Sequence, residues 1–292
     1  MTPIVSKCVL HRVKFLMIVI FELLFFIVIV TLLVMLAKKF LFRNWFDNSI
    51  IKKSTITQQE WDEAYRELPL LKGLNDQEKE RLEELSILFI HQKSFDAAQG
   101  FEITRHVLLV ISLQACLPIL MLGLDCYKQF STIIVYPAGF KTNRKETDEN
   151  GIVDYDRAHK LGESWLQGPV ILSWHDARAG GMLDGSNVVI HEFAHKLDMQ
   201  NGVANGFPPL HKGVKRSNWV KGFTDAFDYF ERHCHGNDLH GIDCYAATDP
   251  AEFFSVFSEM FFEKPTVIRK YFPEVYKLLE EYYQQSPIYR LS

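Results

Sequence analysis

Residues 187–202 read NVVIHEFAHKLDMQNG. The apolar residues of this stretch recur at helical spacing and an Asn-Gly pair ends it, so the pattern predicts one amphipathic helix. On that helix His191 and His195 lie one turn apart on the same side, where both imidazoles can bind one metal ion. Glu192 stands beside them, placed to act as general base on a water molecule at the metal. The stretch therefore predicts an HExxH metal centre.

A catalytic zinc usually has three protein ligands, so a third ligand is needed. Residues 245–262 read YAATDPAEFFSVFSEMFF and predict a second helix that Asp249 caps and from which Glu252 projects. Asp249 and Glu252 also have the spacing of a capping box, in which the glutamate binds only backbone N–H groups. Spacing alone leaves both roles open. Glu259 is an alternative, as a ligand or as the partner of a ligand imidazole. Weaker alternative ligands lie on loop-like sequence, at His211, His233, His235 and His240.

Two further side chains have candidate roles beside the metal. Tyr245 lies seven residues before Glu252, and its phenol can donate a hydrogen bond to an oxyanion or can be an ordinary half-buried tyrosine. Asp198 is interpreted as a carboxylate that orients a ligand imidazole, with helix capping or a salt bridge as alternatives. The His and Cys residues between positions 233 and 244 lack the paired spacing of a second metal site.

The composition limits the classes of protein that the chain can belong to. Its 292 residues, 48% hydrophobic and 23% charged, suit one sizeable globular unit and exclude a disordered chain. Residues 54–292 carry 24 Lys and Arg against 34 Asp and Glu, so no nucleic-acid partner is expected. The five cysteines show no paired spacing, which favours a reducing compartment over a disulfide framework.

The amino terminus carries a long apolar run. Residues 15–37 have only one charged residue and are long enough to cross a bilayer, so they predict a transmembrane helix after a short segment, 1–14. The run is too long for a cleaved signal, which favours a retained anchor followed by a linker over 38–54. Five Lys and Arg follow the run within the linker and three precede it, so the body is expected in the cytoplasm.

The remainder predicts an α+β body. Residues 55–128 have helical periodicity, and the apolar stretch 107–122 is short enough to be a buried helix rather than a second span. Runs rich in β-branched residues at 131–136 and 170–174 predict strands within a second subdomain over 129–292.

Several motifs, in the same order, resemble the MtfA family of bacterial zinc metallopeptidases. The resemblance covers roughly residues 61–291, and its motifs beyond the two helices are LQACLP at 113–118, VYPAGF at 135–140, GPVILSW at 168–174 and YYQQSPIYRL at 282–291.

The resemblance implies Zn2+ bound by His191, His195 and Glu252, with Glu192 as catalytic base and Tyr245 as the hydrogen-bond donor to the transition state. It also implies a zincin-like fold similar to the catalytic domain of anthrax lethal factor, whose edge strand pairs with an extended substrate. Members of the family are similar in cleaving small model peptides and in binding the transcription repressor Mlc. The apolar amino terminus departs from that pattern.

The leading interpretation is a zinc metallopeptidase anchored in the bacterial inner membrane through its single helix, with the catalytic body in the cytoplasm and peptides or proteins as substrates. The alternative is a regulatory zinc protein that sequesters an Mlc-like repressor, with proteolysis secondary. An intramembrane peptidase is excluded because His191 lies about 150 residues beyond the only predicted span.

Overall fold

The first of two units in the chain, Met1–Ser54, contains one long helix, α1 (Pro3–Lys52), and the second unit is Thr55–Ser292. This computed structural model describes residues 3–138, 168–234 and 241–291, without the α1 side chains of 3–16, 18–20, 36, 37, 39 and 40. Among the described residues, no helix has the length and apolar character that crossing a membrane requires. The predicted span over 15–37 falls partly on side chains outside the description and stays a prediction.

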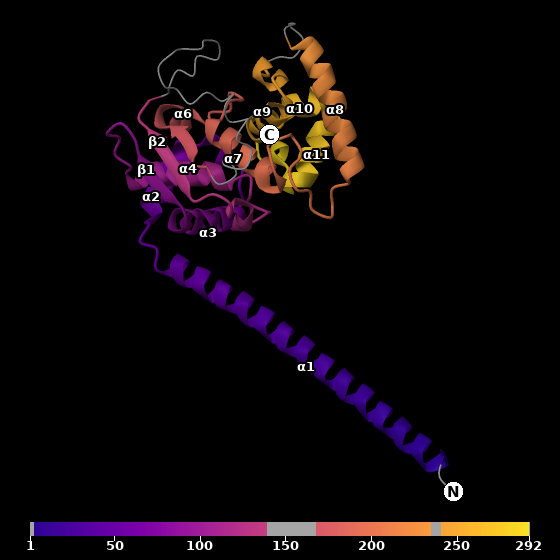
Figure 1. The fold of residues 1–292 in the computed structure, drawn as a ribbon. Coiled ribbons are helices and arrows are strands. Elements are labelled where there is room, and N and C mark those ends of the chain that lie inside the picture. Colours follow the sequence, from indigo (N-terminus) through magenta and orange to yellow (C-terminus); the bar gives the residue numbers. More distant parts are fainter. Residues whose placement is uncertain (1–2, 139–167, 235–240, 292) are drawn as a thin grey trace. The chain divides into compact units, whose positions relative to one another are not determined.

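The second unit confirms the predicted α+β class, with many helices around one small sheet (Figure 1). Its described helices are α2 (Gln58–Arg66), α3 (Asp76–Gln92), α4 (Arg105–Cys116), α6 (Trp174–Ala179), α7 (Val188–Asp198), α8 (Arg216–His233), α9 (Pro250–Glu263), α10 (Pro265–Tyr271) and α11 (Pro273–Tyr283). Short 3₁₀ turns link them, among them η5 (Cys244–Ala247). The predicted buried helix over 107–122 is α4, which is buried in this unit but ends at Cys116, so turns follow over the rest of the stretch.

Three parallel strands form the described sheet, in the order β1 (Ser94–Ala97), β2 (Thr132–Tyr136) and β3 (Val170–Ser173). The β-branched run TIIVY in β2 has the alternating burial of a strand with one face on the core. Sequence periodicity missed β1 because the strand has only four residues and follows directly on a long helix. The predicted strand 170–174 is one residue too long, since Trp174 begins α6.

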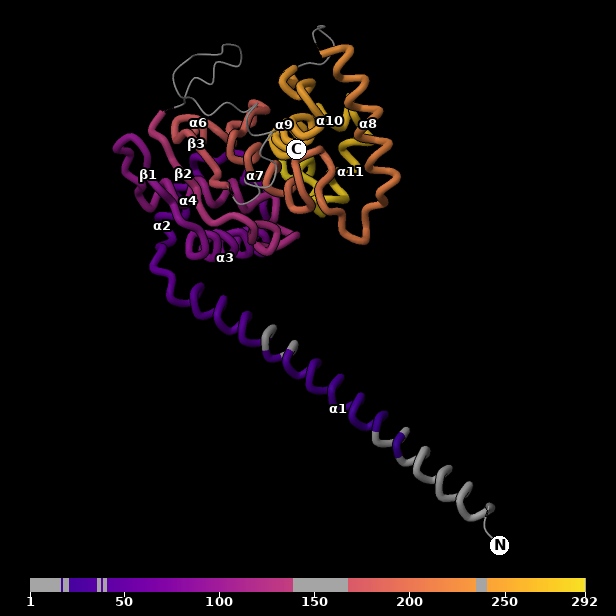
Figure 2. Tube along the Cα trace, in the orientation of Figure 1, coloured from indigo at the N-terminus to yellow at the C-terminus, as the bar shows by residue number. Residues whose placement is uncertain are grey.

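Helix α7 lies between the sheet and the carboxy-terminal helices (Figure 1), in contact with β3, α4 and α9. On its apolar side Phe193 is fully buried, with its ring centroid 5.5 Å from Phe89, 5.0 Å from Tyr127 and 5.7 Å from Phe130. These edge-on and tilted aromatic contacts hold the helix against α3 and against the residues that lead into β2. Helix α9, some fifty residues further along the chain, packs against its other side (Figure 2).

Candidate metal centre

Helix α7 presents His191 and His195 on its side that faces α9. The helix begins where the Asn187 side chain accepts the backbone N–H of Ile190 at 3.0 Å, so the first turn is capped. Both imidazoles are largely buried, with 14% of the His191 side chain and 10% of the His195 side chain exposed. Their Nε2 atoms lie 3.1 Å apart, as the sequence spacing predicts for two ligands of one ion.

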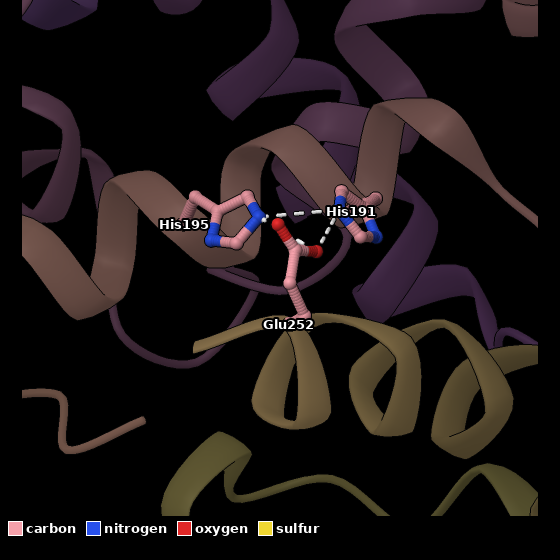
Figure 3. A group of neighbouring side chains, drawn as sticks. All are labelled: His191, His195 and Glu252. Atoms are coloured by element: carbon pink, nitrogen blue, oxygen red, sulfur yellow. Dashed lines mark hydrogen bonds and ion pairs between the residues drawn. The ribbon is translucent and has the colours of Figure 1, made fainter. Parts of the chain in front are cut away.

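Glu252 reaches the same point from the first turn of α9. Asp249 caps this helix by accepting the N–H groups of Ala251 at 2.8 Å and Glu252 at 3.0 Å. The Glu252 carboxylate is directed at the imidazoles of α7 instead of the cap (Figure 3). Of the two roles that spacing left open, the structure therefore favours the one directed at the metal over the capping box.

The three side chains converge on one point. Glu252 Oε2 lies 3.0 Å from His191 Nε2 and 3.4 Å from His195 Nε2. Among the described residues, His191, His195 and Glu252 are the one group of three or more His, Cys, Asp or Glu residues arranged to hold a metal ion.

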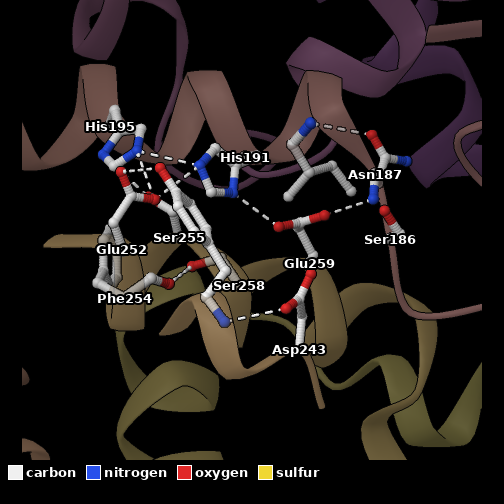
Figure 4. A network of polar contacts seen from close by, with 12 residues as sticks. Ser186, Asn187, His191, His195, Asp243, Glu252, Phe254, Ser255, Ser258 and Glu259 are labelled. Atoms are coloured by element: carbon white, nitrogen blue, oxygen red, sulfur yellow. Dashed lines mark hydrogen bonds and ion pairs between the residues drawn. The ribbon is translucent and has the colours of Figure 1, made fainter. Parts of the chain in front are cut away.

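Partners on the far side of each ring set the direction of the imidazoles. His191 Nδ1 lies 2.7 Å from Glu259 Oε1, and His195 Nδ1 lies 3.1 Å from Ser255 Oγ (Figure 4). Because the Glu259 carboxylate holds the Nδ1 edge of the His191 ring, the Nε2 edge of that ring faces Glu252. Glu259 is thus the partner of an imidazole, one of the two roles that spacing allowed it.

The donor set fits a tetrahedral divalent cation such as zinc. Two ligands about 2.0–2.1 Å from a tetrahedral ion lie about 3.3–3.4 Å apart, close to the distances within this group. Glu252 Oε2 is buried, and no well-aligned hydrogen bond from the described residues reaches it. Burying a carboxylate oxygen without a hydrogen bond lowers the stability of the folded chain unless a cation lies beside that oxygen.

The electrostatics of the group favour positive charge at the same point. Burial lowers the pKa of the His191 imidazole, but its contacts with Glu252 and Glu259 outweigh burial and raise that pKa well above its usual value. Burial raises the pKa of Glu252, but the two imidazoles outweigh it and hold that carboxyl pKa well below its usual range. A divalent ion would satisfy the same carboxylate more strongly than a single imidazolium proton does.

Tyr245 and Glu192 lie at the edge of the group. The Tyr245 hydroxyl donates to Glu252 Oε1 at 2.9 Å, and its ring centroid is 6.1 Å from that of His191. Glu192 is half-buried beside His191, and its charge acts on both His191 and Lys196. Burial lowers the pKa of Lys196 to about 8, although Glu192 opposes that shift.

The alternative ligands have other partners. His211 Nε2 lies 2.9 Å from the carbonyl oxygen of Glu281, and His233 Nδ1 lies 2.7 Å from the carbonyl oxygen of Tyr229. Cys244 donates to the Cys234 carbonyl oxygen. His235 and His240 lie outside the described residues.

Asp198 does not orient an imidazole through a hydrogen bond, which was one of the roles that the sequence left open for it. Its Oδ2 accepts the backbone N–H groups of Asn205 at 2.7 Å and Gly206 at 2.6 Å, and the carboxylate hydrogen-bonds neither imidazole. Asp198 therefore holds the loop that follows α7. This loop lies against the start of α9: the Gly206 backbone is so close that a Cβ there would lie 2.4 Å from the Pro250 carbonyl oxygen. The loop folds back through tertiary contacts that spacing does not reveal.

Sequence reasoning also missed Ser255 and Glu263, both buried on α9. The sequence does hold a pattern that could have identified them, because only a few polar residues interrupt the apolar sequence of α9. Glu252, Ser255, Glu259 and Glu263 follow one another at intervals of three and four, so they share one face of the helix. A polar stripe on an otherwise buried helix marks side chains that need polar partners.

An HExxH helix whose two histidines meet a glutamate from a second helix is the donor arrangement of a metallopeptidase. The comparison with protein families agrees: the family model described as glucose-regulated metallopeptidase M90 matches residues 42–284. The chain belongs to this family, and the resemblance to the MtfA proteins is confirmed.

Curated relatives are similar over most of their length. The Mlc titration factor A of Salmonella typhimurium is 40% identical over 248 residues, which cover 82% of this chain and 92% of that protein. The protein of the same name from Cronobacter sakazakii is 38% identical over 231 residues, covering 78% and 87%. The one from Escherichia coli is 37% identical over 233 residues, covering 79% and 88%.

Replacing Asp198 by Asn should change how stability depends on pH. Burial outweighs the N–H groups of Gly206 and Asn205 and raises the Asp198 pKa from 3.8 to about 6, so the folded chain holds this proton more tightly than the unfolded chain. That contribution is complete below pH 3.8 and is lost as the pH rises through 6. We expect the free energy of unfolding of Asp198→Asn, relative to the parent, to rise by about 2 kcal/mol between about pH 4.5 and pH 7.5.

Urea unfolding of both full-length proteins, followed by tryptophan fluorescence, measures this difference. A difference between them that stays constant across the pH range would contradict the assignment.

Proposed function

We propose that the chain is a zinc-dependent peptidase whose metal is held by His191, His195 and Glu252. The observation that carries the proposal is the meeting of two Nε2 atoms and one carboxylate oxygen, from three largely buried side chains, within 3.0–3.4 Å of one another. Zinc bound there would act as a Lewis acid toward a peptide carbonyl and would lower the pKa of water.

Glu192 is the general base in this proposal. It is adjacent to His191 on α7, it is half-buried, and its charge acts on the His191 imidazole. Glu192 would take a proton from the attacking water and pass it to the leaving amine. Tyr245 would turn its hydroxyl from Glu252 to the substrate oxygen as negative charge develops there.

Strand β3 would hold the substrate. Among the described strands it is at the edge of the sheet, paired with β2 alone, and it contacts α7. Lys196, on α7, donates at 2.9 Å to the carbonyl oxygen of Gly168, just before β3. An extended peptide added to this edge would run beside the metal helix, in the manner of the zincin-like fold.

Glu192→Gln tests the general base. This substitution removes the base but leaves every metal-directed atom in place, so bound zinc should stay at the parent level while kcat falls about 100-fold to 10,000-fold. Metal analysis and a peptide-cleavage assay with and without chelator measure the two quantities. Glu231→Gln, on an exposed part of α8, is the matched control. Parent-level cleavage by Glu192→Gln would remove the mechanism.

Tyr245→Phe separates two roles of the phenol. If the hydroxyl donates to the developing oxyanion, kcat should fall about 100-fold or more while KM and zinc affinity change little. If it only holds Glu252, zinc affinity should fall instead. Steady-state kinetics and a chelator competition distinguish the two, and an unchanged kcat refutes the catalytic role.

A second candidate function is sequestration of a transcription regulator. It is favoured by the similar proteins at 37–40% identity, which are named for titration of Mlc. Purified Mlc-type repressor should co-elute intact with both the parent and Glu192→Gln if sequestration is the function. Fragments formed by the parent alone would indicate cleavage, and co-elution with neither would reject this candidate.

We also propose that the amino-terminal helix tethers the protein to the bacterial inner membrane with its body in the cytoplasm. The proposal rests on the apolar sequence of 15–37 and the basic residues that follow it. After alkaline extraction of cells, the full chain should stay in the membrane pellet, and a chain lacking residues 1–54 should be soluble. Release of the full chain into the soluble fraction would contradict the tether.

A further inference from the structure

Glu263 ends the polar stripe of α9 but touches neither imidazole. Glu252, Ser255 and Glu259 each contact a histidine of the metal group, whereas Glu263 lies one turn further on and is only 3% exposed. Burial raises the pKa of Glu263 to about 7. A carboxyl group that is this costly to bury calls for a reason beyond packing.

Three N–H groups from one segment converge on the Glu263 carboxylate. Oε1 accepts the backbone N–H of Gly181 at 2.7 Å and the side-chain amide of Asn187 at 3.1 Å. Oε2 accepts the backbone N–H of Gly185 at 2.9 Å. All three donors belong to residues 181–187, which lead directly into α7.

This segment has little regular structure of its own. Gly181 and Gly185 have φ values of +81° and +88°, and Leu183 has φ +62°. A Cβ at Gly185 would lie 2.6 Å from Met260 Sδ, so the backbone approaches α9 closely at that point. The Glu263 carboxylate supplies acceptors that a helix or strand would otherwise provide.

Asn187 links this segment to the metal group. It is fully buried, its side chain caps α7, and its amide also donates to Gln114 Oε1 at 2.9 Å. Its backbone N–H donates at 2.5 Å to Glu259, which binds His191 Nδ1 through its other oxygen (Figure 4). The backbone N–H of His191 in turn donates to the Asn187 carbonyl oxygen at 2.9 Å. If Asn187 moved, both the Glu259 carboxylate that contacts the His191 ring and the carbonyl oxygen that accepts the His191 backbone N–H would move with it.

We infer that Glu263 is a positioning residue of the metal centre: it fixes residues 181–187 and, through Asn187 and Glu259, the direction of the His191 imidazole. This inference rests on the metal role proposed above for His191.

Glu263→Gln tests the inference, because one oxygen becomes an NH2 group that opposes an N–H donor of the segment. Zinc affinity, measured by competition with a chromophoric chelator on the full chain, should fall about tenfold. The visible absorption of the Co2+-loaded chain, which reports ligand geometry, should change as well. Glu78→Gln is the matched control, because Glu78 makes a part-buried ion pair with Arg290 at 2.9 Å that involves neither α7 nor α9.

Asn187→Ser provides a second route if Glu263→Gln does not fold. Serine keeps a good helix cap but cannot bridge to Glu263, so zinc affinity should again fall. In the double variant the two losses should not add, since both break one path.

The inference would be overturned if Glu263→Gln kept the zinc affinity and the Co2+ spectrum of the parent and lost only thermal stability, as the control does. So would full additivity of the two substitutions. Failure of the parent itself to bind zinc would refute the proposed function and this inference with it, and the parent measurement alone identifies that case.

Discussion

The packing of α7 against α9 is the constraint on which the site depends. Two imidazoles come from one turn of α7, and the carboxylate comes from a helix that begins more than fifty residues later. The three acceptors meet only when these helices dock at one register. Phe193, on the far side of α7, fixes the helix against the aromatic core and so sets the direction in which His191 and His195 point.

The polar stripe of α9 makes that register costly to change. Glu252, Glu259 and Glu263 are all buried, and each has specific partners: the imidazoles, the first turn of α7 or the segment before it. A shift of one helical position would leave buried carboxylates without donors, at a cost of several kcal/mol each. The groups that would hold a metal and its imidazoles therefore also specify how the two helices pack.

Local patterns predicted much of this protein, and tertiary contacts account for what they missed. The HExxH helix follows from apolar spacing and an N-terminal cap, which are properties of adjacent residues. The role of Glu252 remained open because a glutamate three residues after Asp249 fits a capping box equally well. The partners of Ser255 and Asp198 depend on where α7 and the loop at Gly206 fold, which no local spacing encodes.

The central claim is that one zinc ion is bound by two imidazole nitrogens and one carboxylate oxygen. X-ray absorption at the zinc edge of the full chain, loaded with one equivalent of metal, tests it most directly. The account predicts a low-coordinate site with the multiple-scattering signature of two imidazoles, oxygen as the remaining ligand, and no sulfur. A spectrum that requires cysteine sulfur, or that shows no imidazole, would contradict it.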